Sequence, residues 1–210
     1  MIVAAATAVD ASQGTAAAQQ AQGKKAGDLM LRLRGIGVIP DESSSVSVIG
    51  GSIDATNTAT PEFDISYFFT DNFAVELIAA ATKHDIKAKG TTIGSPTLGS
   101  TWLLPPTVTV QYHPMPRERF SPYVGLGANV SFFFDEKPNR GAGITGLKID
   151  NGVGVALQAG IDVNIQGNWY ANFDVKKLFL NVDGKVNGGA IKADVDLDPW
   201  IIGLGVGYKF

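Results

Sequence analysis

The feature that most constrains this fold is a strict alternation of side chains at the end of the chain, from Trp200 to Phe210. The odd-numbered positions of this stretch carry Ile201, glycine or Lys209. Successive side chains of a β-strand point to opposite faces, so a period of two predicts a strand with one apolar face and one small-residue face. The apolar face consists of Trp200, Ile202, Leu204, Val206, Tyr208 and Phe210.

The same alternation recurs in seven further predicted strands, at about residues 28–39, 56–69, 73–86, 101–112, 120–134, 152–165 and 168–182. Short connections alternate with long ones: the short ones are 70–72, 114–119 and 166–167, and the long ones are 40–55, 87–100, 135–151 and 183–196. Short periplasmic turns and longer external loops are typical of a membrane barrel. The pattern predicts an all-β fold, an eight-stranded antiparallel up-and-down transmembrane β-barrel.

A soluble barrel of the lipocalin kind is the alternative, with its apolar face inward and its polar face in water. The polar face here is mostly Gly, Ser, Thr and Asn, which suit a crowded interior, whereas Lys and Glu are sparse. Aromatic residues such as Phe69, Tyr112 and Trp169 lie beside the short connections, as in a girdle at a membrane interface. The predicted strands also exceed the crossing length of about 9–11 residues. These features favour the membrane barrel.

Composition sets further bounds. The 210 residues predict one barrel domain over 28–210. The net charge of −3 argues against nucleic acid as a partner, and the lack of cysteine excludes disulfides and thiolate metal sites. Residues 1–27 are rich in Ala, Gln, Thr and Gly, and we interpret them as a flexible leader or the remnant of an export signal. A disordered tail without a targeting role is the alternative.

Eight strands enclose an interior just wide enough for side chains or one small ligand, so a wide aqueous pore is excluded. Inward charges should pair, because a buried unpaired charge is costly. Arg32, Glu76, Asp162 and Lys209 all fall on inward positions near the periplasmic side. We predict that they form a polar plug in the lumen; the alternative is that they only fill the barrel and fix its register.

Higher in the predicted barrel, the inward positions become apolar. Ile78, Ala80, Phe133 and Leu178 are the candidates for lining a hydrophobic path, with ordinary packing under the loops as the alternative. Lys176 lies on the same inward face but is charged, and it is therefore a possible gate.

Other constellations are weak, and no metal, cofactor or enzymatic activity is expected. His84 and His113 fall near opposite ends of the barrel, which disfavours a shared metal site. Asp194, Asp196 and Asp198 alternate on one face, where they could bind a cation or simply form a solvated loop stem. Glu76 and Asp162 could be imagined as catalytic carboxylates, but no substrate cleft or Ser-His-Asp order is legible.

Four groups of segments, taken together and in order, resemble the outer-membrane protein W family, which includes alkane-import porins. The segments are 34–43 (RGIGVIPDES), 70–80 (TDNFAVELIAA), 104–107 (LPPT) with 120–127 (FSPYVGLG), and 197–200 (LDPW) running into 207–210 (GYKF).

The resemblance implies a bacterial outer-membrane location and uptake of small hydrophobic molecules through a narrow, largely apolar channel, with lateral exit into the bilayer. It also implies that Tyr208 and Phe210 belong to the signal read by the barrel-assembly machinery. Passive import is our leading hypothesis. The alternative is a structural or interaction barrel whose external loops bind lipopolysaccharide, a host surface or phage. An outer-membrane lipid enzyme would need a polar triad at the membrane rim, and the sequence shows none.

Overall fold

The computed structural model describes residues 23–41, 43–46, 51–92 and 94–210. Eight antiparallel strands follow one another around a ring, and the last strand pairs back with the first, with Met30 opposite Lys209 and Ile39 opposite Trp200. This confirms the predicted eight-stranded barrel and its closing strand. In spatial order the ring consists of β1 (Leu29–Ile39), β4 (Thr58–Phe68), β5 (Phe73–Ala80), β8 (Thr107–Tyr112), β9 (Phe120–Pro138), β11 (Gly152–Gln166), β12 (Trp169–Val186) and β14 (Trp200–Lys209).

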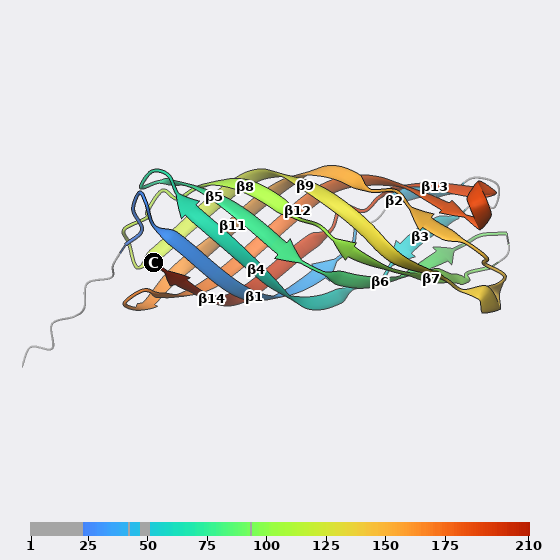
Figure 1. The fold of residues 1–210 in the computed structure, drawn as a ribbon, viewed down its shortest axis with the longest axis horizontal. Helices are drawn as coiled ribbons and strands as arrows, with labels where there is room; N and C mark the ends of the chain where they lie inside the picture. Colours follow the sequence, from blue (N-terminus) through green and yellow to red (C-terminus); the bar gives the residue numbers. More distant parts are fainter. Residues whose placement is uncertain (1–22, 42, 47–50, 93) are drawn as a thin grey trace, which may run out of the picture.

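The barrel is elongated, and its two ends differ (Figure 1). The short connections and the C-terminus lie at one end, which we call the base; the long hairpins lie at the other end, which we call the rim. Outward side chains are apolar over most of the ring, where Leu204 and Val153 are 67 % and 73 % exposed. Near the rim, residues 82–89 instead turn Lys83, Asp85, Lys87 and Lys89 outward. Within the described part of the chain, no helix is long and apolar enough to cross a membrane.

We predicted four long connections as loops, and this prediction is wrong in one respect, because the connections contain strands. Hairpins that leave the barrel continue their backbone pairing toward the rim, which satisfies the main-chain donors and acceptors. Val182, for example, still pairs with Val195, and Lys185 with Lys192. These shorter elements are β2 (Ser43–Val46), β3 (Ser52–Ala55), β6 (Thr82–Lys89), β7 (Thr97–Leu104), β10 (Leu147–Ile149), β13 (Ile191–Asp196) and two 3₁₀ turns at Arg140–Ala142 and Asn187–Gly189.

Two predicted strands, 73–86 and 101–112, are interrupted in the structure. Ile78 pairs with Thr107, and the next pair joins Thr82 to Leu103, so the register is kept across three positions without ladder pairing. Residues 105 and 106 are both proline, which has no N–H to donate to a ladder. The wall between β5–β6 and β8–β7 is therefore locally unpaired.

Aromatic side chains gather on the outer face near the base. Phe73 contacts Phe69 and Tyr112, with ring centroids 6.1 and 5.1 Å apart. On the closing side of the barrel, Tyr208 contacts both Trp169 and Phe210. Amphipathic and aromatic rings concentrated at one level are typical of a membrane interface.

Residues 23–27 belong to the base of the barrel, so the expected leader boundary after residue 27 lies too far along the chain. The Lys24 amide donates to the Pro116 carbonyl at 2.7 Å, and the Gly27 amide donates to that of Phe68 at 2.7 Å. The Lys24 side chain is fully buried. The leader interpretation of residues 1–22 falls outside the described residues.

Candidate functional site

The base half of the lumen is built around two arginines of β1. The register of β1 and β4 places Arg32 opposite Asp64 and Arg34 opposite Glu62, so opposite charges face each other across neighbouring strands. The Arg32 guanidinium lies 2.8 Å from Asp64 and 2.8 Å from Asp162, which enters from the other side of the barrel.

Arg34 lies one inward position closer to the rim and contacts carboxylates from three strands. Its Nε lies 2.8 Å from Glu62, and Nη2 lies 2.7 Å from Asp64 and 3.2 Å from Glu76. Its Nη1 lies 3.5 Å from Asp174. A delocalised, planar guanidinium is suited to such multiple pairing.

Lys176 closes this arrangement on the rim side. Its Nζ lies 2.9 Å from Glu62 and 2.8 Å from Asp174, and its side chain is 2 % exposed. We name the whole set the ionic cluster. Its members are Lys24, Arg32, Arg34, Glu62, Asp64, Glu76, Asp162, Asp174 and Lys176.

Neutral side chains complete the cross-section of the lumen. The Tyr123 hydroxyl donates to Asp174 at 2.7 Å and accepts from Asn172 at 3.0 Å, and Gln158 donates to Asp174 at 2.8 Å. Gly160 makes room for Tyr123, because a Cβ at that position would overlap the phenol ring. Charges and dipoles therefore fill the base half, and a wide water-filled passage through it is excluded.

Lys24 enters the cluster from the base. Its Nζ lies 2.6 Å from Asp162 and 3.1 Å from His113 Nδ1. Burial lowers the pKa of Lys24 to about 8, although the neighbouring Asp162 acts in the opposite direction. Lys209 does not join the cluster. Its Nζ donates a hydrogen bond to the Gly23 carbonyl at 2.7 Å and lies 3.1 Å from Asp28.

Of the four residues predicted for the plug, the structure thus brings together Arg32, Glu76 and Asp162, while Lys209 anchors the N-terminal segment instead. The sequence prediction overlooked other members of the cluster. Arg34 and Asp64 share the inward alternation of their strands with Arg32, and this signal could have identified them. Lys24 precedes the first strand, where no periodicity places it.

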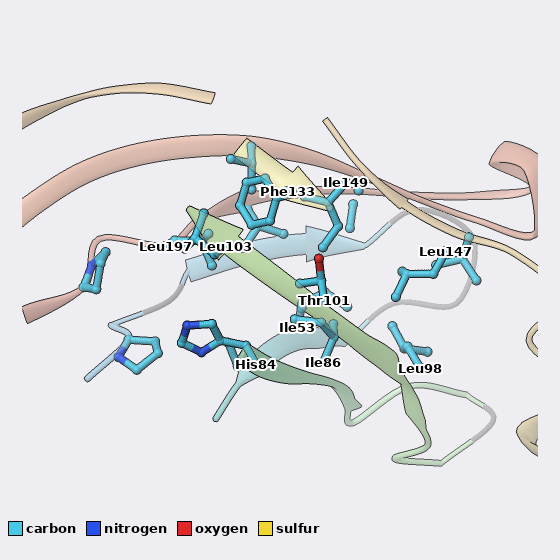
Figure 2. Close-up of a pocket in the computed structure, with 18 of the residues that line it drawn as sticks. Ile53, His84, Ile86, Leu98, Thr101, Leu103, Phe133, Leu147, Ile149 and Leu197 are labelled. Atoms are coloured by element: carbon cyan, nitrogen blue, oxygen red, sulfur yellow. The ribbon is translucent and has the colours of Figure 1, made fainter. Parts of the chain in front are cut away.

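The rim half of the lumen is apolar and contains two neighbouring cavities. The upper chamber has a volume of about 80 Å³, and Figure 2 shows side chains converging on it from several strands. Its labelled lining residues are Ile53, His84, Ile86, Leu98, Thr101, Leu103, Phe133, Leu147, Ile149 and Leu197.

The lower chamber has a volume of about 30 Å³ and lies between the upper chamber and the ionic cluster. The two chambers share Val38, Leu103 and Pro199 in their linings. Glu62 and Lys176 form the polar floor of the lower chamber. Its other lining residues are Ile36, Val38, Ile78, Ala80, Thr82, Leu103, Pro105, Thr107, Leu178, Pro199 and Ile201.

The residues proposed for the hydrophobic path fall on these two chambers. Ile78, Ala80 and Leu178 line the lower chamber, and Phe133 lines the upper one (Figure 2). Lys176, the possible gate, lies at the boundary between the apolar half and the ionic cluster.

The two histidines lie in different halves of the lumen, because His84 lines the upper chamber and His113 lies at the base. Within the described residues, no group of three or more His, Cys, Asp or Glu could hold a metal ion. Asp194 and Asp196 both accept hydrogen bonds from Asn181, at 2.7 and 2.9 Å. Asp198 instead accepts from the Leu180 amide at 2.9 Å.

The unpaired stretch of wall lies beside the lower chamber. Ala80 and Pro105 both line this chamber and face each other across the interrupted ladder. The Pro106 carbonyl accepts from the Val130 amide of β9 at 3.0 Å. The Pro105 carbonyl accepts from the Thr107 hydroxyl at 3.0 Å and from the Asn129 side chain at 3.1 Å, so neither carbonyl bonds β5. An apolar cavity thus borders a stretch of barrel wall without ladder pairing.

Comparisons with known proteins agree with this geometry. The OmpW family matches residues 25–210. The outer-membrane protein y4mB of Sinorhizobium fredii is 44 % identical over 184 residues, or 86 % of this chain and 79 % of that protein. Outer membrane protein W of Vibrio cholerae is 35 % identical over 195 residues, or 88 % and 89 %. The crystal structure of OprG from Pseudomonas aeruginosa matches with a TM-score of 0.82 and 32 % identity, covering 90 % of this chain and 98 % of that one.

Proposed function

Because the chain belongs to the OmpW family of outer-membrane proteins, we propose that it is a passive channel for the uptake of small hydrophobic molecules. Membership in this family places the protein in the bacterial outer membrane, in contact with its bilayer, as a non-enzymatic β-barrel. The base is then the periplasmic end and the rim the external end.

The observation that carries the proposal is the division of the lumen into an apolar external half and a sealed, charged periplasmic half. A small apolar molecule gains by leaving water for the two chambers, whose linings are almost entirely hydrophobic. Continuing through the ionic cluster would require it to separate buried charges, which is costly. In this mechanism the polar plug therefore ends the path, and Ile78, Ala80, Phe133 and Leu178 line it.

Lateral exit supplies the second step of the proposed mechanism. The wall beside the lower chamber lacks ladder pairing between Ile78–Thr107 and Thr82–Leu103. Separating strands there breaks fewer backbone hydrogen bonds than in a continuous ladder, and the neighbouring Leu104 and Val108 expose apolar side chains on the outer surface. A hydrophobic molecule in the lower chamber would pass between Ala80 and Pro105 into the bilayer, with Lys176 closing the way to the periplasm.

The test is the entry of the apolar fluorophore N-phenyl-1-naphthylamine into outer-membrane vesicles that keep their lipopolysaccharide leaflet. Vesicles with the barrel should take up the probe faster than barrel-free vesicles. Phe133→Asp and Ile78→Asp should each slow entry, because a carboxylate in an apolar chamber repels an apolar probe.

The matched control is Thr92→Asp, which adds the same charge at an exposed position outside both chambers. Unchanged entry in folded Phe133→Asp and Ile78→Asp would contradict the path. Equal entry with and without the barrel would favour the alternative, a structural or interaction barrel that binds lipopolysaccharide, a host surface or phage.

We further propose that Tyr208 and Phe210 form the signal for the barrel-assembly machinery. Tyr208 lies near the end of β14 and Phe210 directly follows this strand, and their rings contact each other with centroids 4.8 Å apart. Phe210→Ala should lower the folded amount in the outer membrane but leave refolding in detergent intact. Equal losses in both settings would indicate a packing role only.

A further inference from the structure

The floor of the lower chamber keeps hydrogen-bonding capacity that the protein does not use. Lys176 Nζ donates to Glu62 Oε1 at 2.9 Å and to Asp174 Oδ1 at 2.8 Å. An ammonium group has three hydrogens, so one donor remains. Glu62 makes its ion pairs with Lys176 and Arg34 through Oε1 in both cases. Its Oε2 has no bonded partner among the described residues, so an acceptor remains as well.

The other polar groups of this chamber are already engaged. The Thr107 hydroxyl donates to the Pro105 carbonyl at 3.0 Å and accepts from Asn129 at 2.9 Å. The Thr82 hydroxyl is bonded to His84 at 3.0 Å. One donor and one acceptor on the floor are thus left under an otherwise apolar cavity.

This combination discriminates between chemical classes of guest. A hydroxyl group both donates and accepts, so it could donate to Glu62 Oε2 and accept from Lys176 Nζ at once. A plain hydrocarbon would desolvate both groups and bond neither. A carboxylate would bring a second negative charge to Glu62.

The surroundings do not compensate for that added negative charge. The ionic cluster contains four cations, Lys24, Arg32, Arg34 and Lys176, and five carboxylates, Glu62, Asp64, Glu76, Asp162 and Asp174. It therefore offers an anion no surplus of positive charge.

We propose that the lower chamber selects neutral amphiphiles, namely molecules with one hydroxyl-like head group on a short apolar chain, over hydrocarbons and carboxylates of the same length. This inference rests on the proposed uptake function and specifies its substrate class. The head group lies against the Lys176–Glu62 pair, and the chain extends toward the upper chamber.

The test is competition against N-phenyl-1-naphthylamine entry into barrel-containing vesicles by octane, 1-octanol and octanoate, with barrel-free vesicles as the membrane control. 1-Octanol should inhibit at a concentration about tenfold lower than octane, which is the effect of about one net hydrogen bond. The double variant Lys176→Met/Glu62→Leu replaces the polar floor by apolar side chains of similar size. It should abolish the preference, which is read as the ratio of the inhibitory concentrations of octane and 1-octanol and not as the rate of probe entry.

The matched control is Lys185→Met/Asp150→Leu, which makes the same kind of replacement at an exposed pair 2.6 Å apart near the rim. This control should keep the preference for 1-octanol. Folding of every variant is checked by the shift of the unheated barrel on an SDS gel.

A single variant, Glu62→Gln, tests the inference even if the double variant does not fold. It keeps the shape and an acceptor but removes the negative charge, so octanoate should become a better competitor relative to 1-octanol. Equal inhibition by octane and 1-octanol in the native barrel, or an unchanged preference in the folded double variant, would overturn the inference and leave the uptake proposal standing. Probe entry that does not depend on the barrel would overturn both.

Discussion

The two halves of the lumen are enclosed by strands of the same hairpins, yet one half is filled by charged side chains and the other contains apolar cavities. In the periplasmic half, inward side chains such as Arg32, Asp64 and Asp162 interlock in buried ion pairs. In the external half, inward residues such as Leu178 and Phe133 border unfilled apolar space. The halves thus differ in the residue type that points inward, and this difference decides which half is sealed and which can hold a guest.

The largest expected effect comes from breaking the sealed half. Arg32→Met should lower the free energy of unfolding by about 3–5 kcal/mol, because it leaves Asp64 and Asp162 buried without their shared cation. Chemical unfolding of the barrel in detergent micelles measures this loss. Arg32→Lys keeps the charge but not the forked geometry, and it should lose less. Equal stability of Arg32→Met and the native barrel would show that the cluster is dispensable for folding.

The next effect separates stability from transport in the external half. Leu178 is buried and lines the lower chamber, so Leu178→Ala should cost about 2 kcal/mol, at the low end for such a truncation, and should speed probe entry by enlarging the chamber. Leu180 is equally buried but lines neither chamber. Leu180→Ala should therefore destabilise the barrel without faster entry. Equal changes in entry for both variants would contradict the assignment of the chamber.

A smaller effect on stability and probe entry is expected from a substitution in the unpaired stretch of the barrel wall. Pro105→Val supplies an N–H opposite Ala80, and one added hydrogen bond should raise stability by about 0.5–1.5 kcal/mol. Repairing the ladder should also slow probe entry if exit is lateral. Pro122 lies on β9 within the continuous ladder with β11, opposite Ile161, and lines neither chamber, so Pro122→Val serves as the control that leaves entry unchanged. Faster entry in Pro105→Val would argue against exit at this position.

The alternation of side chains in the sequence predicted the barrel strands and their inward residues. It did not predict the paired hairpins beyond the barrel or the buried residues that lie outside an alternating segment. Period two placed Trp200–Phe210 as the closing strand and put Arg32, Glu76 and Asp162 inside, because inward and outward residues alternate along every barrel strand. It could not show that 183–196 continues as a paired hairpin, because whether a hydrophilic segment pairs depends on its neighbour. The burial of Lys24 could not be predicted for a similar reason, because it depends on the ion pair with Asp162, which lies on a strand far away in the sequence.

The smallest effect tests whether the ionic cluster matters because of its charges or because of their burial. Lys185 and Asp150 form a Lys–Asp pair 2.6 Å long near the rim, with side chains 43 % and 36 % exposed. Arg32 and Asp162 form a pair of similar length, 2.8 Å, with both side chains fully buried. Water and salt solvate each partner of the exposed pair when the other is removed, whereas no solvent replaces Arg32. Lys185→Met should therefore leave the unfolding midpoint unchanged, and a loss comparable to that of Arg32→Met would show that pairing itself, rather than the sealed surroundings, distinguishes the two halves.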